Sequence, residues 1–591
     1  MKELKHLNKY FFKYKTHLII GILITIIARI FLLFTPRYVK KIFTVVDTYK
    51  NGLGSGNSTF QAELAEIIFY VIGAALIAGL FTFLMRQTII NVSRYIEFDL
   101  KNEVYEHYQK LSLNFYKKNR TGDLMNRISE DVSRVRMYVG PAIMYSINTV
   151  TLFIIALIYM FNEAPSLTLY TVIPLPILSI AIYKLSKEIH KRSTVVQQYL
   201  STLSAFTQES FSGISVIKAY GIEPKTSSNF DELSQTSKQK QIDLVKVQAL
   251  FFPMMILLIG VSNLVVIYVG GVQYVTGKID SLGTIAEFII YVNMLTWPVA
   301  TVGWVTSIVQ QAEASQKRIN EFLKIEPEIK NNVAAPTLIT GDITFDNVSF
   351  TYDDTNIEAL KGISFSVKDG ETLAILGKTG SGKSTVLDLI GRLYDIDNGS
   401  ITINSIEVNK HNLNDLRNSI GYVPQDAFLF SDSIKNNIKF GKENATDEEI
   451  IEVAKYAQVH KNIIKFNKGY NTILGERGIT LSGGQKQRIS IARALIKDPK
   501  ILLFDDCLSA VDTETEEKIL KNLNAISKGK TTIIVGHRVS SVKNADKIIV
   551  LDNGLIIEEG THETLLQIDG YYKHLYLKQL SETSSLKKEI I

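Results

Sequence analysis

A glycine-rich stretch in the middle of the chain carries the residue types that hold phosphate groups. Its residues are, in order, Gly377, Lys378, Thr379, Gly380, Ser381, Gly382, Lys383, Ser384 and Thr385. Glycines let backbone amides close around phosphate oxygens, while Lys383 can reach the β- and γ-phosphates and Ser384 can ligate Mg²⁺. An apolar strand over residues 372–376 is expected before the stretch and a helix from near Val386 after it, which favours anions at its start. This order predicts a P-loop that binds a nucleoside triphosphate with Mg²⁺.

A second candidate for metal binding lies further along the chain. Residues 501–504 are apolar and are followed directly by Asp505, so they predict a buried strand that ends in a carboxylate. In P-loop proteins an aspartate at that place helps to hold Mg²⁺. Many buried strands end in aspartate, so Asp505 is informative only together with the P-loop.

Between these two motifs the chain reads Leu-Ser-Gly-Gly-Gln at residues 481–485. Small residues with free amides at a helix N-terminus form a second phosphate-binding site. This motif, after a P-loop and before the strand-ending aspartate, resembles the signature of the ATP-binding cassette (ABC) family. The resemblance implies that Ser482, Gly483, Gly484 and Gln485 close over the γ-phosphate of ATP bound by a second subunit. Two such domains would then hold two ATP molecules between them.

Further residues match the ABC pattern one at a time. The resemblance implies that Tyr352 stacks on adenine, that Gln425 senses Mg²⁺ and that His537 contacts the γ-phosphate. It also implies that residues 475–478 form the exporter-type loop before the signature, and that residues 509–512 join the two ATP sites across the dimer. Each residue alone could equally be a core tyrosine, a turn glutamine or a satisfied histidine. Their common order and spacing favour the family assignment.

One position departs from the family pattern. Most active members have glutamate directly after the strand-ending aspartate, where it polarises the attacking water, and this chain has Asp506. Aspartate is one methylene shorter, with roughly 1.5 Å less reach. A misplacement of about 1 Å can cost on the order of 10²-fold in rate. We therefore expect a slow or silent site and favour a heterodimer with a second half-transporter that supplies the glutamate, with a homodimer of two weak sites as the alternative.

The composition separates the chain into two halves. The 591 residues are 46% apolar and 21% charged, and the long charge-free runs all lie before residue 325. We expect a transmembrane domain over 1–325, a linker over 326–340 and an ATP-binding cassette domain over 341–591. The net charge of +6 is too small to indicate nucleic-acid binding. Cys507 is the only cysteine, which excludes an internal disulfide.

The first half contains segments long enough to cross a bilayer, which takes about 20 apolar residues. Six are predicted, over residues 16–36, 67–85, 139–161, 164–183, 247–277 and 288–312. Two long charged connections, 94–136 and 184–246, are rich in Lys and Arg, so both are expected to be helical and to face the cytoplasm. Arg29 is the one charged residue within the spans, and it either contacts an anionic substrate group or pairs with a polar group on a neighbouring helix.

The resemblance extends into the membrane half, where residues 119–132 and 209–223 are similar to the two coupling regions of fused exporters. It implies a multi-domain fold: an all-α six-helix transmembrane domain with long cytoplasmic extensions, plus an α/β P-loop nucleotide-binding domain. The implied function is ATP-dependent export of a small amphiphilic or hydrophobic molecule by alternating access. The alternative is a mainly regulatory ATP-binding half with little hydrolysis of its own. The expected location is a bacterial plasma membrane, with the ATP domain in the cytoplasm.

Overall fold

The protein divides into two compact units. The computed structural model describes residues 2–51, 57–475, 478–508 and 513–589. The first unit contains residues 1–108 and 122–325, and the second contains residues 109–121 and 326–591. A short piece of the N-terminal half of the sequence therefore belongs to the C-terminal unit.

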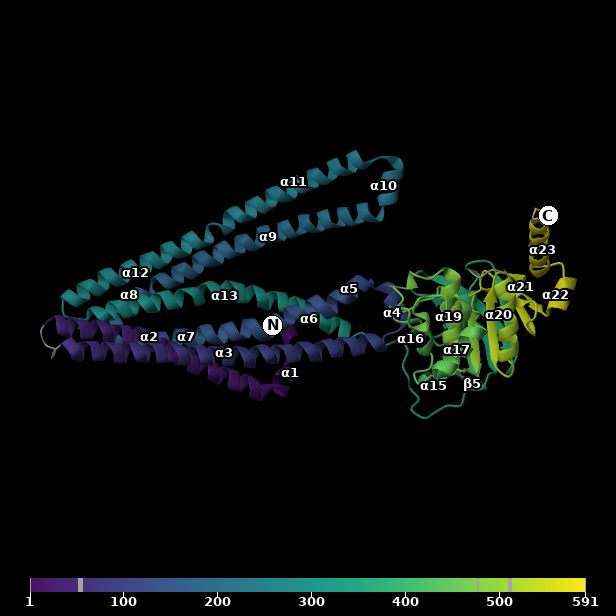
Figure 1. Cartoon of the computed structure of the whole chain (residues 1–591), viewed down its shortest axis with the longest axis horizontal. Helices are drawn as coiled ribbons and strands as arrows, with labels where there is room; N and C mark the ends of the chain where they lie inside the picture. The colour runs from purple at the N-terminus through teal and green to yellow at the C-terminus, as the bar shows by residue number, and fades with distance from the viewer. Residues whose placement is uncertain (1, 52–56, 476–477, 509–512, 590–591) are drawn as a thin grey trace. The chain divides into compact units, whose positions relative to one another are not determined.

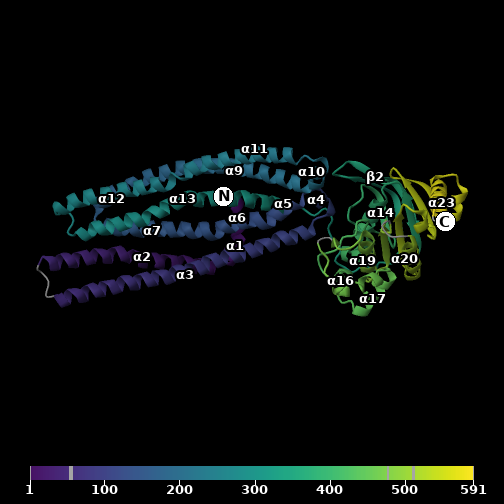
Figure 2. The same ribbon diagram turned by 45° about the horizontal axis from the view of Figure 1, so that its top comes forward.

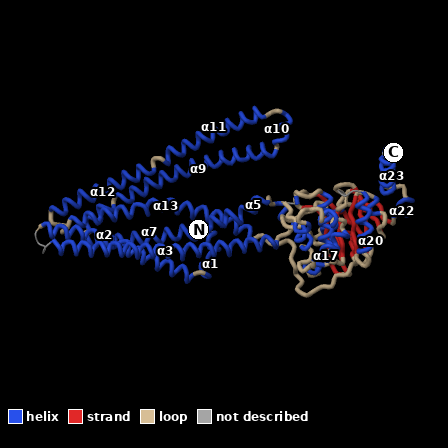
Figure 3. Tube along the Cα trace, in the orientation of Figure 1, coloured by secondary structure: helices blue, strands red, loops and turns tan. Residues whose placement is uncertain are grey.

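The first unit is built of helices, and Figure 3 shows all the strands in the second unit. Its main helices are α2 (Lys15–Lys50), α3 (Asn57–Lys110), α7 (Ile143–Glu163), α8 (Pro165–Val172), α9 (Pro174–Ser212), α11 (Glu223–Gln248), α12 (Phe251–Val275) and α13 (Leu282–Leu323). They pack through a buried apolar cluster that includes Leu33 of α2, Leu152 of α7 and Phe288 of α13. The shorter helical segments are η1 (Glu3–Leu7), α1 (Asn8–Lys13), α5 (Thr121–Asn126), η2 (Arg127–Asp131), α6 (Val132–Met137), η3 (Tyr138–Ala142) and α10 (Ile214–Tyr220).

Five helices in the described part of the chain are long and apolar enough to cross a membrane, by length and composition. They correspond to the first, second, third, fifth and sixth predicted spans. The fourth predicted span, residues 164–183, is divided between α8 and the start of α9. The two helices separate at Ile173 because Pro174 has no N–H with which to continue the hydrogen bonding of α8. A crossing by residues 164–183 therefore remains a prediction.

The two long charged connections are helical. In the second of them, α9 and α11 run side by side and α10 joins their far ends, as Figures 1 and 2 show. The helical path from α5 to α7, which leads from the first connection into the third predicted span, contains two π-helical turns, η2 and η3. Such turns insert an extra residue into the helix and are frequent at functional sites.

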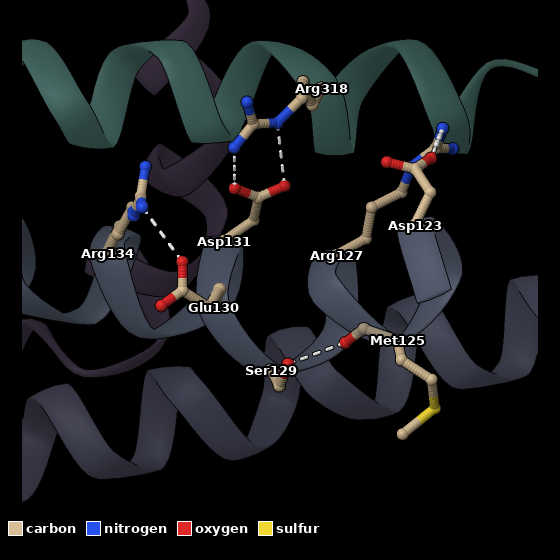
Figure 4. A network of polar contacts seen from close by, with 8 residues as sticks. All are labelled: Asp123, Met125, Arg127, Ser129, Glu130, Asp131, Arg134 and Arg318. Atoms are coloured by element: carbon tan, nitrogen blue, oxygen red, sulfur yellow. Dashed lines mark hydrogen bonds and ion pairs between the residues drawn. The ribbon is translucent and has the colours of Figure 1, made fainter. Parts of the chain in front are cut away.

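An ion pair between a buried carboxylate and a half-exposed arginine fixes the first π-helical turn to α13. Asp131, in η2, is almost fully buried and accepts a hydrogen bond from Nε of Arg318 at 2.9 Å, while a second nitrogen of the same guanidinium bonds its other oxygen. Figure 4 shows this bidentate contact together with two neighbouring ion pairs, Arg127–Asp123 and Arg134–Glu130. Bidentate pairs of this kind fix geometry as well as adding energy.

The second unit contains two sheets. The antiparallel sheet has the order β2–β1–β4–β5, formed by β1 (Ile343–Tyr352), β2 (Ile357–Val367), β4 (Asn398–Ile403) and β5 (Ile406–Glu407). The larger sheet has the order β10–β9–β3–β8–β7–β6, formed by β3 (Thr372–Gly377), β6 (Ile420–Val423), β7 (Ile501–Asp505), β8 (Thr531–Gly536), β9 (Lys547–Asp552) and β10 (Leu555–Gly560). All its strand pairs are parallel except the β9–β10 pair. The carboxyl ends of β3, β7 and β8 therefore meet at one edge, where ligands bind in open α/β sheets.

Helices cover both faces of the larger sheet. Alternate residues of one strand enter different apolar clusters, for example Leu502 on one face and Leu503 on the other. This period of two explains why the strands read as continuous apolar runs. The helical segments of the unit are α4 (Leu113–Lys118), α14 (Lys383–Ile390), η4 (Val408–Lys410), α15 (Leu413–Asn418), α16 (Ile434–Lys439), α17 (Asp447–Tyr456), α18 (His460–Ile463), η5 (Gly469–Asn471), α19 (Gly483–Leu495), α20 (Thr513–Ile526), α21 (Val539–Val542), α22 (His562–Gln567) and α23 (Tyr571–Glu589).

Candidate nucleotide-binding site

The glycine-rich loop connects β3 to α14 at the carboxyl edge of the larger sheet. Gly377 and Gly382 both have positive φ, and a Cβ at either would collide with a backbone carbonyl, of Leu551 and Ala359 respectively. Only glycine therefore fits at these two positions. The helix begins at Lys383, three residues before the predicted start at Val386. The last residues of the motif thus form the first turn of α14, which brings the helix N-terminus to the loop.

The side chain of Lys383 folds back into the loop. Its Nζ donates hydrogen bonds to the carbonyl oxygens of Gly377 at 2.9 Å and Lys378 at 2.6 Å. Burial lowers the pKa of Lys383, and the negative charges of Asp506 and Asp505 oppose this shift. The positive charge of this buried ammonium is met only by neutral carbonyl groups in the loop. A phosphate bound in the loop would give it a negatively charged partner.

The first turn of α14 also contacts the end of β7. The hydroxyl of Ser384 donates a hydrogen bond to Oδ1 of Asp505 at 2.9 Å. Burial raises the pKa of Asp505, and the Ser384 hydrogen bond acts against this rise. A hydroxyl and a carboxylate oxygen placed together are the ligands that Mg²⁺ takes beside nucleotide phosphates. The residues present therefore fit the ion that the P-loop implies.

Two further predicted residues follow neighbouring strands. Asp506 comes directly after β7 in a left-handed conformation, with φ of 43°, and its N–H donates to the carbonyl of Val535 in β8 at 3.0 Å. His537 comes directly after β8, and its carbonyl accepts a hydrogen bond from Gln579 of α23 at 3.0 Å. The charges of Asp506 and His537 both act on the pKa of Asp505, so the three side chains share one electrostatic environment.

The signature lies at the start of another helix. Ser482 is the N-cap of α19, and its hydroxyl accepts a hydrogen bond from the N–H of Gln485, whose side chain in turn accepts one from the N–H of Ser482. This reciprocal capping fixes the first turn. Ser482 and Gly483 are exposed, so the helix N-terminus is accessible from outside the chain.

Tyr352, at the end of β1, lies beside the P-loop helix. Its hydroxyl shares a hydrogen bond with the hydroxyl of Thr385 at 3.0 Å. Its ring contacts Phe350 and Tyr394 edge to face, with centroids 4.9 Å and 5.5 Å away. Burial raises the pKa of Tyr352. The predicted adenine-stacking residue is thus joined directly to the phosphate-binding loop.

Comparison with known proteins decides the family. The family description "ABC transporter transmembrane region" matches residues 18–299, and the description "ABC transporter" matches residues 360–509. A relative in Bacillus subtilis, named as a probable multidrug resistance ABC transporter ATP-binding/permease protein, YheI, is 37% identical over 98% of this chain and 97% of its own length. The chain belongs to the ABC transporter family.

Two other comparisons support the same assignment. The multidrug resistance-like ATP-binding protein MdlA of Escherichia coli is 36% identical to this ABC transporter, with 86% of each chain covered. A solved bacterial Atm1-family ABC exporter with ATP bound matches with a TM-score of 0.78 and 27% identity, covering 96% of this chain and 98% of that one. The fold class is therefore as predicted: a helical transmembrane domain of ABC exporter type with an α/β nucleotide-binding domain.

For the remaining predicted residues, the described part of the structure shows no hydrogen bond to the P-loop. Gln425 follows β6 and is exposed. Within the predicted exporter-type loop, residues 476–477 lie outside the described residues, and so does the whole predicted loop 509–512. Arg29 lies within α2, and its Nε is buried without a hydrogen-bond partner in the part of the chain that the structure describes. At this atom, the structure therefore shows, among the residues it describes, no hydrogen bond to a polar group on a neighbouring helix, which was one of the two alternatives for Arg29.

Two charged residues close to the P-loop helix were not predicted from the sequence. Lys117 of α4 places its ammonium 4.3 Å from the centroid of the Tyr352 ring. Asp388 of α14 accepts a hydrogen bond from Tyr422, and burial raises the pKa of its carboxyl to about 6. Asp388 could have been noticed as an acidic residue on an apolar helix, but nothing in the sequence distinguishes Lys117 from the other lysines of its charged connection.

Proposed function

We propose that this ABC transporter is one half of an exporter that uses ATP to move a small amphiphilic or hydrophobic molecule across the membrane by alternating access. The observation that carries the proposal is a P-loop with its Ser384–Asp505 pair and an intact, exposed signature on one chain with a transmembrane region. The printed names of YheI and MdlA refer to multidrug resistance, and that of the solved relative to export. The proposal includes domain limits at 1–325, 326–340 and 341–591, in a bacterial plasma membrane with the ATP domain in the cytoplasm.

The proposed role of ATP is to hold two ATP domains together. The P-loop of one chain, residues 377–385, binds the phosphates through its amides and Lys383. The signature of the partner, residues 482–485, covers the γ-phosphate from the opposite side. Ser384 and Asp505 hold Mg²⁺, with Gln425 nearby, and the bound ion neutralises charge on the phosphates. ATP therefore stabilises the closed state through contacts that the open state does not make.

Closure is expected to reach the membrane helices through the long helical extensions. The tip of the α9–α11 hairpin exposes apolar side chains, with Val216 55% and Tyr220 78% exposed. The ATP domain has a hollow beside α14 whose lining includes Leu393, Phe440 and Arg493. We place the hairpin tip of one chain in this hollow of the partner, since contact between the two would remove exposed apolar area of both from water. In this scheme the substrate cavity between the transmembrane helices faces the cytoplasm without ATP, and closure of the two ATP domains opens it to the outside.

Hydrolysis requires a carboxylate that polarises the attacking water, and Asp506 has the position for it. His537 contacts the γ-phosphate in the same scheme. Because the Asp506 side chain is roughly 1.5 Å shorter than glutamate, we propose that this site is slow and that the chain works with a different half-transporter whose glutamate carries most turnover. A homodimer of two weak sites, and a mainly regulatory half, are the alternatives.

The test compares the chain alone with the chain plus a candidate partner, in lipid vesicles, by phosphate release and by ATP-dependent uptake of a fluorescent amphiphile. Lys383→Ala is the control that removes phosphate binding. The chain alone is expected to bind ATP yet hydrolyse it slowly, and the mixture to be faster. Turnover on the order of 10 per second by the chain alone, abolished in Asp506→Asn, would exclude the slow-site proposal. The same distance between the two ATP domains with and without ATP, measured between spin labels, would exclude the closure scheme.

A further inference from the structure

Lys117 lies in a notch between two tyrosine rings of the ATP-binding unit. Its Nζ is 4.3 Å from the ring centroid of Tyr352 and 4.9 Å from that of Tyr394. The two rings are nearly perpendicular, at 89°, and their centroids are 5.5 Å apart. An ammonium within about 6 Å of a ring centroid is attracted to the ring face, and here one cation serves two rings.

The short helix that carries Lys117 is fixed to the same unit by hydrogen bonds at its N-terminal end. Ser112, just before α4, donates to Glu328 at 2.7 Å. Asn114, which is 5% exposed, donates to Glu328 and to Asp353, both at 3.0 Å. These bonds hold the segment 109–121 in place and fix the backbone of Lys117 beside the two rings, while its own side chain is exposed.

The charge of Lys117 also acts on a buried carboxyl. Lys117 is the cation whose charge acts on Asp388 of α14, and it lowers the pKa of that carboxyl against the effect of burial. Asp505 acts in the opposite direction, and the hydroxyl of Tyr422 donates to Asp388. The surroundings of Lys117 therefore combine two π faces with a carboxylate, which together suit an ammonium.

The ring of Tyr352 is held from several directions. Its hydroxyl is bonded to Thr385, the ring makes an edge-to-face contact with Phe350, and the Lys117 ammonium lies over one face. A planar base that stacks on this ring needs the other face, with the ring held in one orientation. A substitution that lets the ring move increases the conformational entropy that is lost when the base binds.

We propose that Lys117 is a positioning residue for the adenine base: it backs the ring of Tyr352 so that the opposite face is ready to stack. This rests on the proposed role of Tyr352 in binding adenine. Since the cation and the base stabilise the same ring orientation, nucleotide binding and docking of the segment 109–121 strengthen each other. Such coupling is reciprocal, so the segment is also held more firmly when nucleotide is bound.

The experiment measures nucleotide binding to the full chain in lipid nanodiscs, comparing MgATP with magnesium tripolyphosphate, which has the phosphates but no base. Lys117→Met keeps the length of the side chain and removes its charge, and Lys117→Arg keeps a cation that binds aromatic faces. Lys118→Met is the matched control: Lys118 is the neighbouring lysine, and its pair with Asp353 at 3.5 Å is solvent-exposed, so its loss should affect docking of the segment little. A further variant, Lys117→Met with Asp388→Asn, removes both charges and guards against loss of folding through an uncompensated carboxylate.

Lys117→Met, alone and with Asp388→Asn, is expected to weaken MgATP binding about five- to tenfold. Tripolyphosphate binding should be unchanged, and Lys117→Arg and Lys118→Met should bind MgATP like the wild type. In a Tyr352→Leu background, Lys117→Met should have no further effect. Equal weakening of both ligands, unchanged MgATP binding or tighter MgATP binding would each overturn the proposal, the last by showing that Lys117 covers the face that the base uses. If Tyr352→Leu alone binds MgATP like the wild type, the proposed adenine stacking fails instead.

Discussion

Replacing Asp506 by glutamate should increase the ATPase rate of this chain. The substitution adds one methylene, which extends the reach of the carboxylate by roughly 1.5 Å. A displacement of about 1 Å in a reacting group can change a rate on the order of 10²-fold, or about 2.7 kcal/mol in activation free energy. The backbone conformation at this position opposes the gain in rate to a smaller extent. Asp506 has φ of 43°, a conformation that aspartate adopts more readily than glutamate, so the longer residue loses part of the gain.

The net expectation is a rise of roughly 10- to 100-fold in turnover of the chain alone. The assay is phosphate release by the purified chain in nanodiscs at saturating MgATP, with MgATP affinity measured in parallel. Affinity should change little, because the P-loop amides and Lys383 hold the phosphates. Asp506→Asn is the matched control and should reduce the remaining rate. A glutamate variant that binds MgATP normally but is no faster would refute the argument from reach.

Three further changes test other parts of the structure. Asp131→Asn breaks the bidentate contact with Arg318 and should lower stability by about 1–3 kcal/mol, measured as a fall in Tm; an unchanged Tm would show that the pair contributes nothing net. Because burial raises the pKa of Asp388 to about 6, the folded chain holds a proton more tightly than the unfolded chain between about pH 4 and 6, so this carboxyl costs stability as pH rises through that window. Asp388→Asn should therefore raise Tm at pH 7.5 and leave it nearly unchanged near pH 4, and the opposite pH dependence would contradict the assignment. Arg29→Gln should weaken binding of the anionic probe pyrenebutyrate relative to neutral pyrenebutanol without lowering Tm, and equal binding of both probes by wild type and variant would give Arg29 a structural role.

The phosphate-binding parts of the site were predictable because their chemistry constrains the backbone locally. Gly377 and Gly382 are required by positive φ and by nearby carbonyls, and such requirements leave a readable pattern in the sequence. The strand ending at Asp505 was predictable for a similar reason, since a strand buried on both faces is continuously apolar. The start of α14 was predicted three residues late, because Lys383 and Ser384 are functional residues with no helical pattern of their own.

The parts that were not predictable depend on contacts between distant segments. The resemblance of residues 119–132 to a coupling region indicates this part of the chain, but no pattern predicts the contacts of residues 109–118, since Asn114 pairs with Glu328 and Asp353 more than 200 positions away. The π-helical turns around α6 likewise have no sequence pattern in a run of ordinary helix formers. The break between α8 and α9 was readable in principle, because Pro174 interrupts a helix wherever it occurs in its interior.

The contacts of α14 connect the base end of the nucleotide site with the strand that leads to Gln425. Thr385, in the first turn, bonds Tyr352, and Asp388, three residues later on the same side of the helix, is bonded by Tyr422 of β6. Lys117 contacts the ring of Tyr352, and its charge acts on Asp388, so it influences both of these pairs. On the proposed stacking of adenine against Tyr352, a change at the base would reach β6 through side chains one helical turn apart, with no movement of the sheet required. If this route operates, Tyr422→Phe, which removes only the hydroxyl, should reduce the effect of Lys117→Met on MgATP binding, whereas two independent contacts would give additive losses.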